Sequence, residues 1–404
     1  MKSPPDTPPL LLGSLSSFLA ERSRSNVIPE GSFLHASHRD IDSWRTFARQ
    51  RFLTALQVPS FELPEVATIW SRSFDGLTIE KLRWSLPFGN ATEAYLLKPR
   101  YMQGKLPGVL ALHDHGGNKF FGKSKLVRVD GTPHKHLATH QDTYYGGLAW
   151  ANELAKRGYV VLVHDVFPFE SRRIRFDDLP PGLPRSLLRN PVEIEEPAVN
   201  TRNKGNVMDV LDDTIDGYER YNACARQMET VIAKTMFVGG VTWPGITLAE
   251  DRIALEILAS RSEVDRNRIG CCGLSLGGLR SVYLAGSTDG IAAAVVVGFM
   301  TTWNDFVSHI ANDHTWMAIV PGISHFMDFP DIMGMHAPKP AMVCSCTEDP
   351  LFTQTEVRRA EHLLDQIYRK TGNSSQFDFS HYQGSHRFDK TMQENVFAWL
   401  DQHL

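Results

Sequence analysis

A serine at position 275 has the sequence context of a catalytic nucleophile. It lies in Gly273-Leu274-Ser275-Leu276-Gly277-Gly278, after an apolar, strand-like run at 268–272 and before a helical pattern at 276–285. A serine hydroxyl is a weak nucleophile unless the backbone holds it in the open beside a base. Small residues two positions before and after it permit the tight strand-to-helix turn that does this. The pattern predicts a nucleophilic Ser275; the alternative is a glycine-rich turn with an incidental serine.

An acid that could orient the base follows the apolar run at 341–346, in the segment Thr347-Glu348-Asp349-Pro350. Carboxylates placed directly after a strand lie at the sheet edge where such proteins build their sites. We prefer Asp349 to Glu348, because Pro350 biases the backbone of Asp349 away from a helix and the loop should reach the base. The alternative is a solvated carboxylate in a turn.

A histidine suited to act as the base is His386, in Gly384-Ser385-His386 between a strand pattern at 376–382 and the last helical pattern. Its imidazole could take the proton of Ser275 and return it to the leaving group, while Asp349 fixes the tautomer. His381 competes for this role, but it lies within the predicted strand. The order Ser, Asp, His along the chain agrees with this type of sheet.

Donors for a developing oxyanion are predicted after the strand at 108–113, which ends in His113-Asp114-His115-Gly116-Gly117. Backbone N–H groups in such a turn, with that of the residue after the nucleophile, can bind the oxygen of a tetrahedral intermediate. We expect Leu276 to supply one N–H and His115 or Gly116 the other. The alternative is an ordinary tight turn.

The elements that must position these residues alternate between strands and helices from about residue 107. Such alternation is typical of βαβ units, and it predicts an α/β fold with a mostly parallel central sheet and helices on both faces. The expected strands are 108–113, 159–164, 268–272, 291–298, 341–346 and 376–382. The expected helices are 147–157, 248–260, 276–285, 356–370 and 390–404.

The first part of the chain is predicted to be an N-terminal extension, residues 1–74, ahead of a catalytic domain at 75–404. Residues 1–38 are rich in Pro and Ser and suggest an irregular arm, and an amphipathic helix follows Asp40. Strand patterns near 67–72, 77–86 and 93–97 suggest an antiparallel start to the sheet. Residues 166–246 hold a long proline-containing loop and a helical stretch near 212–234, which we interpret as a lid-like insertion over the site.

Taken together, these segments resemble an α/β-hydrolase of the dienelactone hydrolase and acetyl xylan esterase-like group. The resemblance covers roughly residues 75–404 and rests on the segments 112–117, 264–278, 348–352 and 384–386. It implies the α/β-hydrolase fold and a Ser275, Asp349 and His386 triad. This chain departs from the group where the usual His-Gly reads His113-Asp114, and where the usual Gly-rich turn reads 165–173. The elbow also holds serine rather than the cysteine of dienelactone hydrolases proper.

Two further groups of residues could bind ligands. Aromatic and imidazole side chains that could line a substrate pocket are Trp243, Trp303, His314 and Trp316, although aromatic residues are as often core residues. His134, His136 and His140 have a spacing that could bind zinc, but no carboxylate motif accompanies them. We interpret the three histidines as part of a polar loop, and we expect neither metal nor cofactor.

The composition limits the classes of partner. The formal net charge is −4, with no basic block, which gives no basis for binding nucleic acid or an anionic membrane. No apolar run approaches the length of a membrane span, and the start of the chain is a poor signal peptide. The 5 cysteines include no C-x-x-C pair and suggest buried thiols. We expect a cytoplasmic protein with a small-molecule partner, and leave a homo-oligomer open.

These observations predict a serine hydrolase that cleaves carboxylic esters through an acyl-enzyme on Ser275. We expect short acyl groups of the acetyl type, with carbohydrate esters among the candidates. A serine peptidase or amidase of the same fold is the alternative, because the same triad cleaves amides. A non-catalytic, ligand-binding homologue is a further alternative that the intact triad disfavours.

Overall fold

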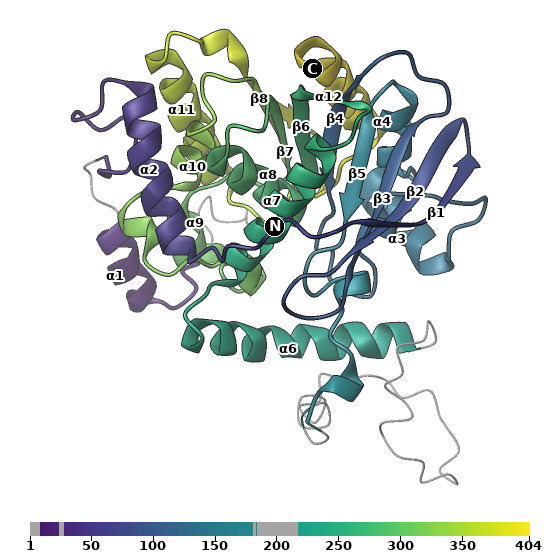
Figure 1. The fold of residues 1–404 in the computed structure, drawn as a ribbon. Coiled ribbons are helices and arrows are strands. Elements are labelled where there is room, and N and C mark those ends of the chain that lie inside the picture. Colours follow the sequence, from purple (N-terminus) through teal and green to yellow (C-terminus); the bar gives the residue numbers. More distant parts are fainter. Residues whose placement is uncertain (1–8, 24–27, 181–182, 184–216) are drawn as a thin grey trace, which may run out of the picture.

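A computed structural model describes residues 9–23, 28–180, 183 and 217–404 of the chain. A sheet of 9 strands in the order β1-β2-β3-β5-β4-β6-β7-β8-β9 forms its centre (Figure 1). Pairs from β5 through β9 are parallel, whereas β1, β2, β3 and β5 pair antiparallel. The predicted α/β fold with a mostly parallel sheet is confirmed.

The strands and longer helices lie close to their predicted positions. The strands are β1 Ala67–Phe74, β2 Leu77–Trp84, β3 Thr92–Pro99, β4 Leu106–Leu112, β5 Val160–His164, β6 Val264–Leu274, β7 Ala293–Val297, β8 Ala341–Cys346 and β9 Phe377–Tyr382. The helices are α1 Ser14–Ser23, α2 Ile41–Leu56, α3 Lys135–Tyr145, α4 Trp150–Lys156, α6 Tyr218–Val238, α7 Trp243–Ala259, α8 Leu276–Ser287, α9 Trp303–Asp305, α10 Phe329–Gly334, α11 Gln354–Lys370 and α12 Lys390–His403.

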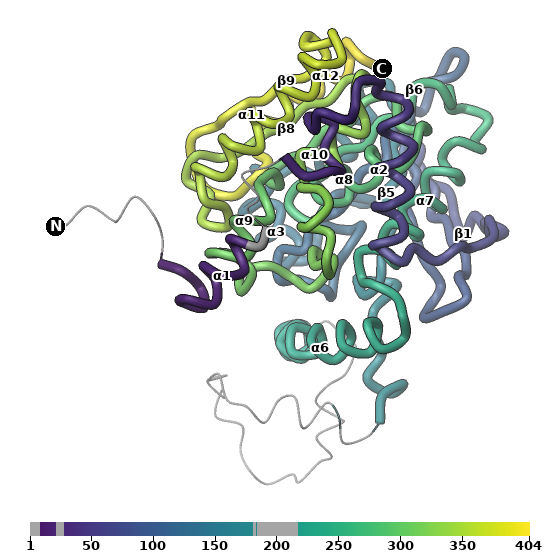
Figure 2. The backbone as a smooth tube through the Cα atoms, turned by 90° about the vertical axis from the view of Figure 1, so that its left-hand side faces the viewer, coloured from purple at the N-terminus to yellow at the C-terminus, as the bar shows by residue number. Residues whose placement is uncertain are grey.

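Helices cover both faces of the sheet, so the middle strands are buried on both sides. In β4, Leu110 and Leu112 face a core formed with α2, α7, α8 and α11. Val109 and Ala111 of the same strand face a second core, formed with α4 and α12. Parallel strands enclosed in this way consist of apolar residues throughout, which explains the short apolar runs in the sequence. Figure 2 shows α2 running along the outside of the molecule near α10.

The N-terminal region contains more structure than we predicted. The helix after Asp40 is confirmed as α2, and the Asp40 side chain caps it by accepting a hydrogen bond from Ser43 N at 2.8 Å. Residues 14–23, predicted to be irregular, form α1, so that expectation is wrong. The first turn of α1 is fixed by a hydrogen bond from Leu12 N to Ser16 Oγ at 3.0 Å, an interaction that composition does not reveal.

The predicted extension contributes strand β1 to the sheet, and the predicted insertion contributes helix α6. Strand β1 belongs to the sheet although it falls within residues 1–74 of the predicted extension. The helical stretch predicted near 212–234 corresponds to α6, and residues 181–182 and 184–216 of the insertion lie outside the described residues. Helix α6 lies crosswise at the foot of the view in Figure 1. Lid-like movement of the insertion stays a prediction.

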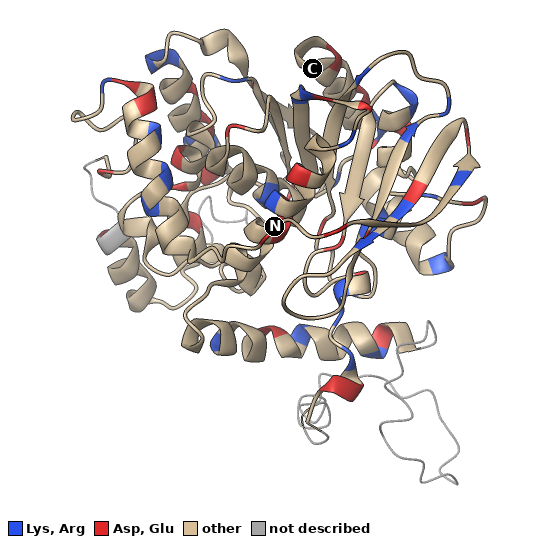
Figure 3. Ribbon diagram, viewed as in Figure 1, with Lys and Arg blue, Asp and Glu red and all other residues tan. Residues whose placement is uncertain are grey.

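Charged residues are interspersed among the elements in the view of Figure 3, which agrees with the near-balanced composition. All 5 cysteines are buried and unpaired with one another, as predicted. Among the helices of the described residues, no single one is long and apolar enough to cross a membrane. The bent pair α6 and α7, at 87°, meets that test only when the two helices are taken together.

Candidate active site

Ser275 lies at the strained turn between β6 and α8. Its backbone has φ 61° and ψ −118°, a region that costs a non-glycine residue energy and is held only where the surroundings enforce it. Here Ser275 N donates to Val297 O at 2.8 Å and Leu279 N donates to Ser275 O at 3.0 Å. A Cβ on Gly273 or Gly277 would collide with the backbone oxygen of Leu112. The glycines of the motif therefore let β6 and α8 pack against the end of β4.

Asp349 and His386 lie together beyond the ends of β8 and β9. His386 Nδ1 donates to Asp349 Oδ2 at 2.6 Å, and Asp349 Oδ1 accepts from Leu351 N at 2.9 Å. Both side chains are nearly buried, at 11% and 2% exposure. His386 Nε2 is buried and has no hydrogen-bond partner among the described residues, and the ring borders the same cavity as Ser275. This arrangement leaves Nε2 available to accept a proton.

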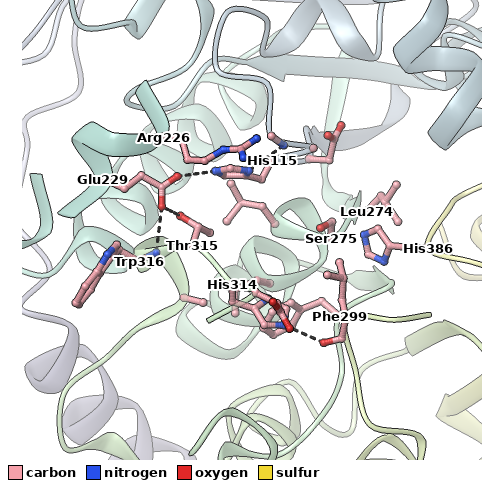
Figure 4. A pocket seen from close by; sticks show the side chains of 18 of the residues that line it. His115, Arg226, Glu229, Leu274, Ser275, Phe299, His314, Thr315, Trp316 and His386 are labelled. Carbon is pink, nitrogen blue, oxygen red and sulfur yellow. Dashed lines mark hydrogen bonds and ion pairs between the residues drawn. The ribbon is translucent and has the colours of Figure 1, made fainter. Parts of the chain in front are cut away.

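A close approach at Gly298 makes room for the histidine ring. Gly298 has φ 59°, and a Cβ there would stand 3.0 Å from Cε1 of His386. Figure 4 shows Ser275 and His386 side by side at the cavity. Three strand ends, those of β6, β7 and β9, thus bring the nucleophile position, the glycine and the histidine together.

The competing residues lie elsewhere. Glu348 is exposed, and its N–H donates to Gly384 O at 3.0 Å. His381 is on β9 and pairs with Glu361 at 2.8 Å. A further acid that could orient a histidine from a strand end is Asp305, which follows β7; it is buried and accepts hydrogen bonds from Thr301 Oγ1 at 2.8 Å and Thr353 N at 3.0 Å. None of these three residues contacts His386 through a hydrogen bond recorded for the described chain.

The proposed oxyanion turn borders the cavity. His115, Gly116 and Leu276 all line it. Leu276 opens α8, where the first N–H groups of a helix have no acceptor inside the helix. Gly116 has φ 49°, and a Cβ there would stand 2.5 Å from Oδ2 of Asp114 and 2.6 Å from Cε1 of His140. The turn therefore requires glycine at this position.

The His115 ring is fixed by a residue that we did not predict, Glu229 of α6. His115 Nδ1 accepts from Gly117 N at 3.1 Å, so Nε2 carries the proton and donates to Glu229 Oε1 at 2.9 Å. Burial and the nearby Lys119 ammonium lower the pKa of His115 to about 4, so the ring is neutral at pH 7. The Lys119 ammonium donates to the same Glu229 oxygen. The neutral His115 ring therefore has a structural role, because it connects the Glu229 carboxylate of α6 to the backbone N–H of Gly117.

The cavity has a volume of about 490 Å³ and lies between the core and α6. Its apolar floor near Ser275 includes Leu279, Phe299 and Ala318. Its outer part is polar and includes residues that we did not predict to line it, namely Arg226, Glu229 and Thr230 of α6 and Asn312, Asp313 and Thr315 of the segment after α9. No local motif marks these residues, because their position depends on how α6 and the segment after α9 pack beside the ends of the strands.

The predicted aromatic pocket residues divide into two groups. His314 and Trp316 line the cavity, and His314 Nε2 donates to Leu351 O at 3.0 Å. Trp243 does not line it, so that expectation is wrong: the side chain is fully buried, and its Nε1 lies 3.4 Å from Phe167 O. Trp303 also lies in the core, stacked on Phe329 at 4.0 Å between ring centroids.

The three histidines with zinc-like spacing lie at the start of helix α3 and within it, so our interpretation of them as part of a polar loop is wrong. His134 caps α3, His136 stacks on Tyr218 at 3.9 Å, and His140 pairs with Asp114 at 3.1 Å. The part of the chain that the structure describes contains no group of three or more potential metal ligands.

Both departures from the family pattern place a buried acid beside a buried lysine. Asp114 pairs with Lys125 at 3.5 Å, and Asp165 pairs with Lys123 at 2.8 Å. Burial alone would raise the pKa of Asp114, but Lys125, His140 and the Tyr145 hydroxyl outweigh burial and hold it well below its usual range. The two lysines belong to one short turn, Lys123–Lys125, beneath the oxyanion turn.

Comparisons with known proteins agree with this architecture. Residues 245–404 match the family described as "Prolyl oligopeptidase family". A Bacillus subtilis (strain 168) protein described as "Putative hydrolase YtaP" is 24% identical over 295 residues, covering 73% of this chain and 77% of that protein.

Two solved structures share the fold over nearly the whole chain. The crystal structure of a "putative acetyl xylan esterase" from Bacteroides fragilis NCTC 9343 has a TM-score of 0.66 at 17% identity, with 96% of this chain and 94% of that chain covered. A glucuronoyl esterase from Solibacter usitatus has a TM-score of 0.57 at 11% identity, with 94% and 98% covered. With its strand order and its serine at the β6–α8 turn, the chain has the α/β-hydrolase fold of these structures.

Proposed function

We propose that the protein hydrolyses carboxylic esters of short acids through an acyl-enzyme on Ser275. The observation that carries this proposal is the hydrogen bond between Asp349 and His386, at 2.6 Å, beside a cavity that also holds the strained Ser275. The likeness to esterase structures supports it.

In this mechanism Ser275 Oγ attacks the ester carbonyl carbon while His386 Nε2 takes the hydroxyl proton. The carbonyl oxygen becomes an oxyanion, held by the N–H groups of Leu276 and of His115 or Gly116. Collapse of the intermediate breaks the bond to the alcohol, which leaves with the proton from His386. Water then attacks the acyl carbon while His386 accepts its proton. The bond between the acyl carbon and Ser275 Oγ breaks, His386 returns the proton to Oγ, and the acid leaves.

The chemistry of the cavity supports a small acid and a polar alcohol. The floor beside Ser275 is apolar and suits a short acyl group, whereas the outer part carries Arg226, Thr230, Asn312 and Asp313. Such polar side chains suit the hydroxyl groups of a carbohydrate alcohol. Trp243, which we expected to line the pocket, does not line it, so the proposal rests on the floor and on Trp316.

A panel of nitrophenyl esters of increasing acyl length tests this proposal, with Ser275→Ala as the matched control. We expect kcat/KM to be highest for acetate and propionate, to fall toward octanoate, and to be lost in Ser275→Ala. Preference for octanoate would contradict the short-acyl proposal. Full turnover by Ser275→Ala would contradict the serine mechanism itself.

The match of residues 245–404 to the prolyl oligopeptidase family favours a second candidate, a peptidase or amidase. Esters and anilides of the same acyl group separate the two candidates. An esterase should leave the anilide essentially uncleaved, whereas comparable kcat/KM values on both would favour the amidase.

A further inference from the structure

Lys125 is a fully buried lysine that contacts the backbone of the oxyanion turn. Its Nζ donates to Asp114 O at 2.8 Å and to His115 O at 3.0 Å, and it lies 4.9 Å from the centre of the Phe169 ring. The side chain has 0% exposure and does not line the cavity. One ammonium group therefore lies behind the turn, on the side away from the substrate.

Lys125 binds the carbonyl groups of the two peptides whose N–H groups we expect to bind the oxyanion. The peptide of the Asp114 carbonyl carries the N–H of His115, and the peptide of the His115 carbonyl carries the N–H of Gly116. Neither peptide bond is cis, and in a trans peptide the C=O and N–H point in opposite directions. Since both carbonyls converge on the buried ammonium, both N–H groups point away from it, toward the side lined by the cavity.

We propose that Lys125 is a positioning residue that aims and polarises the His115 and Gly116 N–H groups which bind the oxyanion. This inference rests on the proposed esterase function. A hydrogen bond from a cation to a carbonyl polarises the peptide and strengthens the N–H at its other end. From behind the turn, the positive charge also attracts an oxyanion through space without contacting the substrate.

The neighbouring Lys123 provides a matched comparison within the same short turn. It is equally buried, but its ammonium pairs with Asp165 at 2.8 Å and Glu170 at 2.5 Å. The described residues give no hydrogen bond from Lys123 to the oxyanion turn. Replacing Lys123 therefore removes a buried lysine from this turn without removing either carbonyl contact of Lys125.

The alternative explanation is that Lys125 serves only as the counter-ion of Asp114. A double variant, Asp114→Asn with Lys125→Met, separates the two roles because it removes both charges and leaves no unpaired buried ion. If Lys125 positions the donors, the double variant should fold with a melting temperature near that of the wild type, yet lose about 10²-fold in kcat with little change in KM. A trifluoromethyl ketone, whose adduct with serine carries an oxyanion, should bind more weakly by a similar factor.

Rates are expressed per site labelled by a fluorophosphonate, so that poor folding is not mistaken for slow turnover. Lys123→Met should retain kcat per labelled site within a few-fold. A double variant with wild-type kcat and wild-type ketone affinity would overturn the positioning role. Absence of labelling at Ser275 in the wild type would instead overturn the proposed function.

The pH profile supplies a readout that a purely structural role would not change. Burial is the main cause that lowers the pKa of Lys125 to about 8. The charge of Lys119 also lowers it, whereas the charges of Asp114 and Glu170 raise it. His140 and Tyr145 face Asp114 from α3. Raising the pH through about 8 removes the ammonium proton, so kcat of the wild type should fall there, and the double variant should lack this fall. Persistence of the fall would assign it to another group, such as Lys119, and count against Lys125.

Discussion

At the scale of single residues, the site depends on one hydrogen bond that sets the histidine tautomer. Asp349 Oδ2 accepts from His386 Nδ1, which leaves Nε2 without a proton and available for the role that we propose for it. Asp349 is buried, whereas its neighbour Glu348 is exposed and contacts the 384 loop only through its backbone. Substitutions of these two adjacent acids therefore test whether Asp349 is the acid that orients His386.

Asp349→Asn should lower kcat on the order of 10⁴-fold, because the amide keeps the shape of the side chain but favours the wrong tautomer. Glu348→Gln should change kcat only slightly, since it removes an exposed charge. Steady-state kinetics of both variants with the same acetyl ester measure this difference. If Glu348→Gln lost activity while Asp349→Asn kept it, the orienting acid would be Glu348 and not Asp349.

The positions of Ser275, Asp349 and His386 after their strands could be predicted, because each follows an apolar strand at a recognisable turn. The residues around them could not. Trp243 was misplaced because we expected this helix to begin only at residue 248. Proline is tolerated in the first turn of a helix, and Thr242 caps α7 by accepting from Gly245 N at 3.1 Å. Trp243 therefore begins a helix and packs into the core.

At the scale of elements, α6 joins three parts of the cavity wall through Glu229. Its carboxylate accepts from His115 at 2.9 Å and from Lys119, and from Thr315 Oγ1 at 2.8 Å. Burial alone would raise the pKa of Glu229, but His115 and Lys119 outweigh burial and lower it. The insertion is thereby tied to the oxyanion turn and to the segment that carries Trp316.

Glu229→Gln should destabilise the protein by about 3 kcal/mol, because it leaves the Lys119 ammonium buried without its carboxylate. It should also raise KM, because the wall formed by α6 and Thr315 loses its connection. Glu219→Gln, an exposed substitution in the first turn of the same helix, is the matched control and should change neither. Denaturant unfolding and acetyl-ester kinetics test both effects. An unaltered stability and KM in Glu229→Gln would show that α6 is held by other contacts.

Strands and helices of the core could be predicted from periodicity, whereas the placement of α6 could not. Helices α7 and α8 are buried along nearly their whole length, and their apolar residues mark them as core helices. For α6 the pattern shows a helix, but its partner is a turn more than a hundred residues earlier, reached through a buried ion pair. Charged pairs such as Lys119 with Glu229 leave no periodic signal in the sequence.

At the scale of the whole molecule, the two ends of the sheet have different roles. The carboxyl end of β6 leads to Ser275, while its other end begins beside an ion-pair network of Glu80, Lys98, Arg261 and Glu263. Glu263 O also accepts from Leu106 N at 2.9 Å, which connects the start of β4 to this corner. We expect this network to stabilise the sheet without affecting catalysis.

The contribution of Glu263 to the free energy of unfolding should decrease as the pH falls. Burial alone would raise the pKa of Glu263, but Lys98 and Arg261 outweigh it and lower the pKa to about 2 from its usual 4.5. A depressed carboxyl pKa stabilises the fold above the unfolded value, and this stability is lost as the pH falls toward the folded value. At pH 7, Glu263→Gln should cost about 1 to 2 kcal/mol of unfolding free energy, with kcat unchanged.

Urea unfolding at pH 7, 4.5 and 3 compares the wild type with Glu263→Gln. The difference between them should be greatest at pH 7 and shrink as the pH falls. A difference that is constant across this range would mean that the substitution acts through packing and not through charge.

The central claim, a covalent acyl-enzyme on Ser275, is tested most directly by locating the adduct of a serine-directed fluorophosphonate. The wild type, and Ser275→Ala as its control, are treated briefly, digested and analysed by mass spectrometry. The claim predicts one adduct, on the peptide that contains Ser275, formed in parallel with loss of acetyl-ester hydrolysis and absent from Ser275→Ala. An adduct on another residue, or complete loss of hydrolysis with Ser275 unmodified, would contradict it.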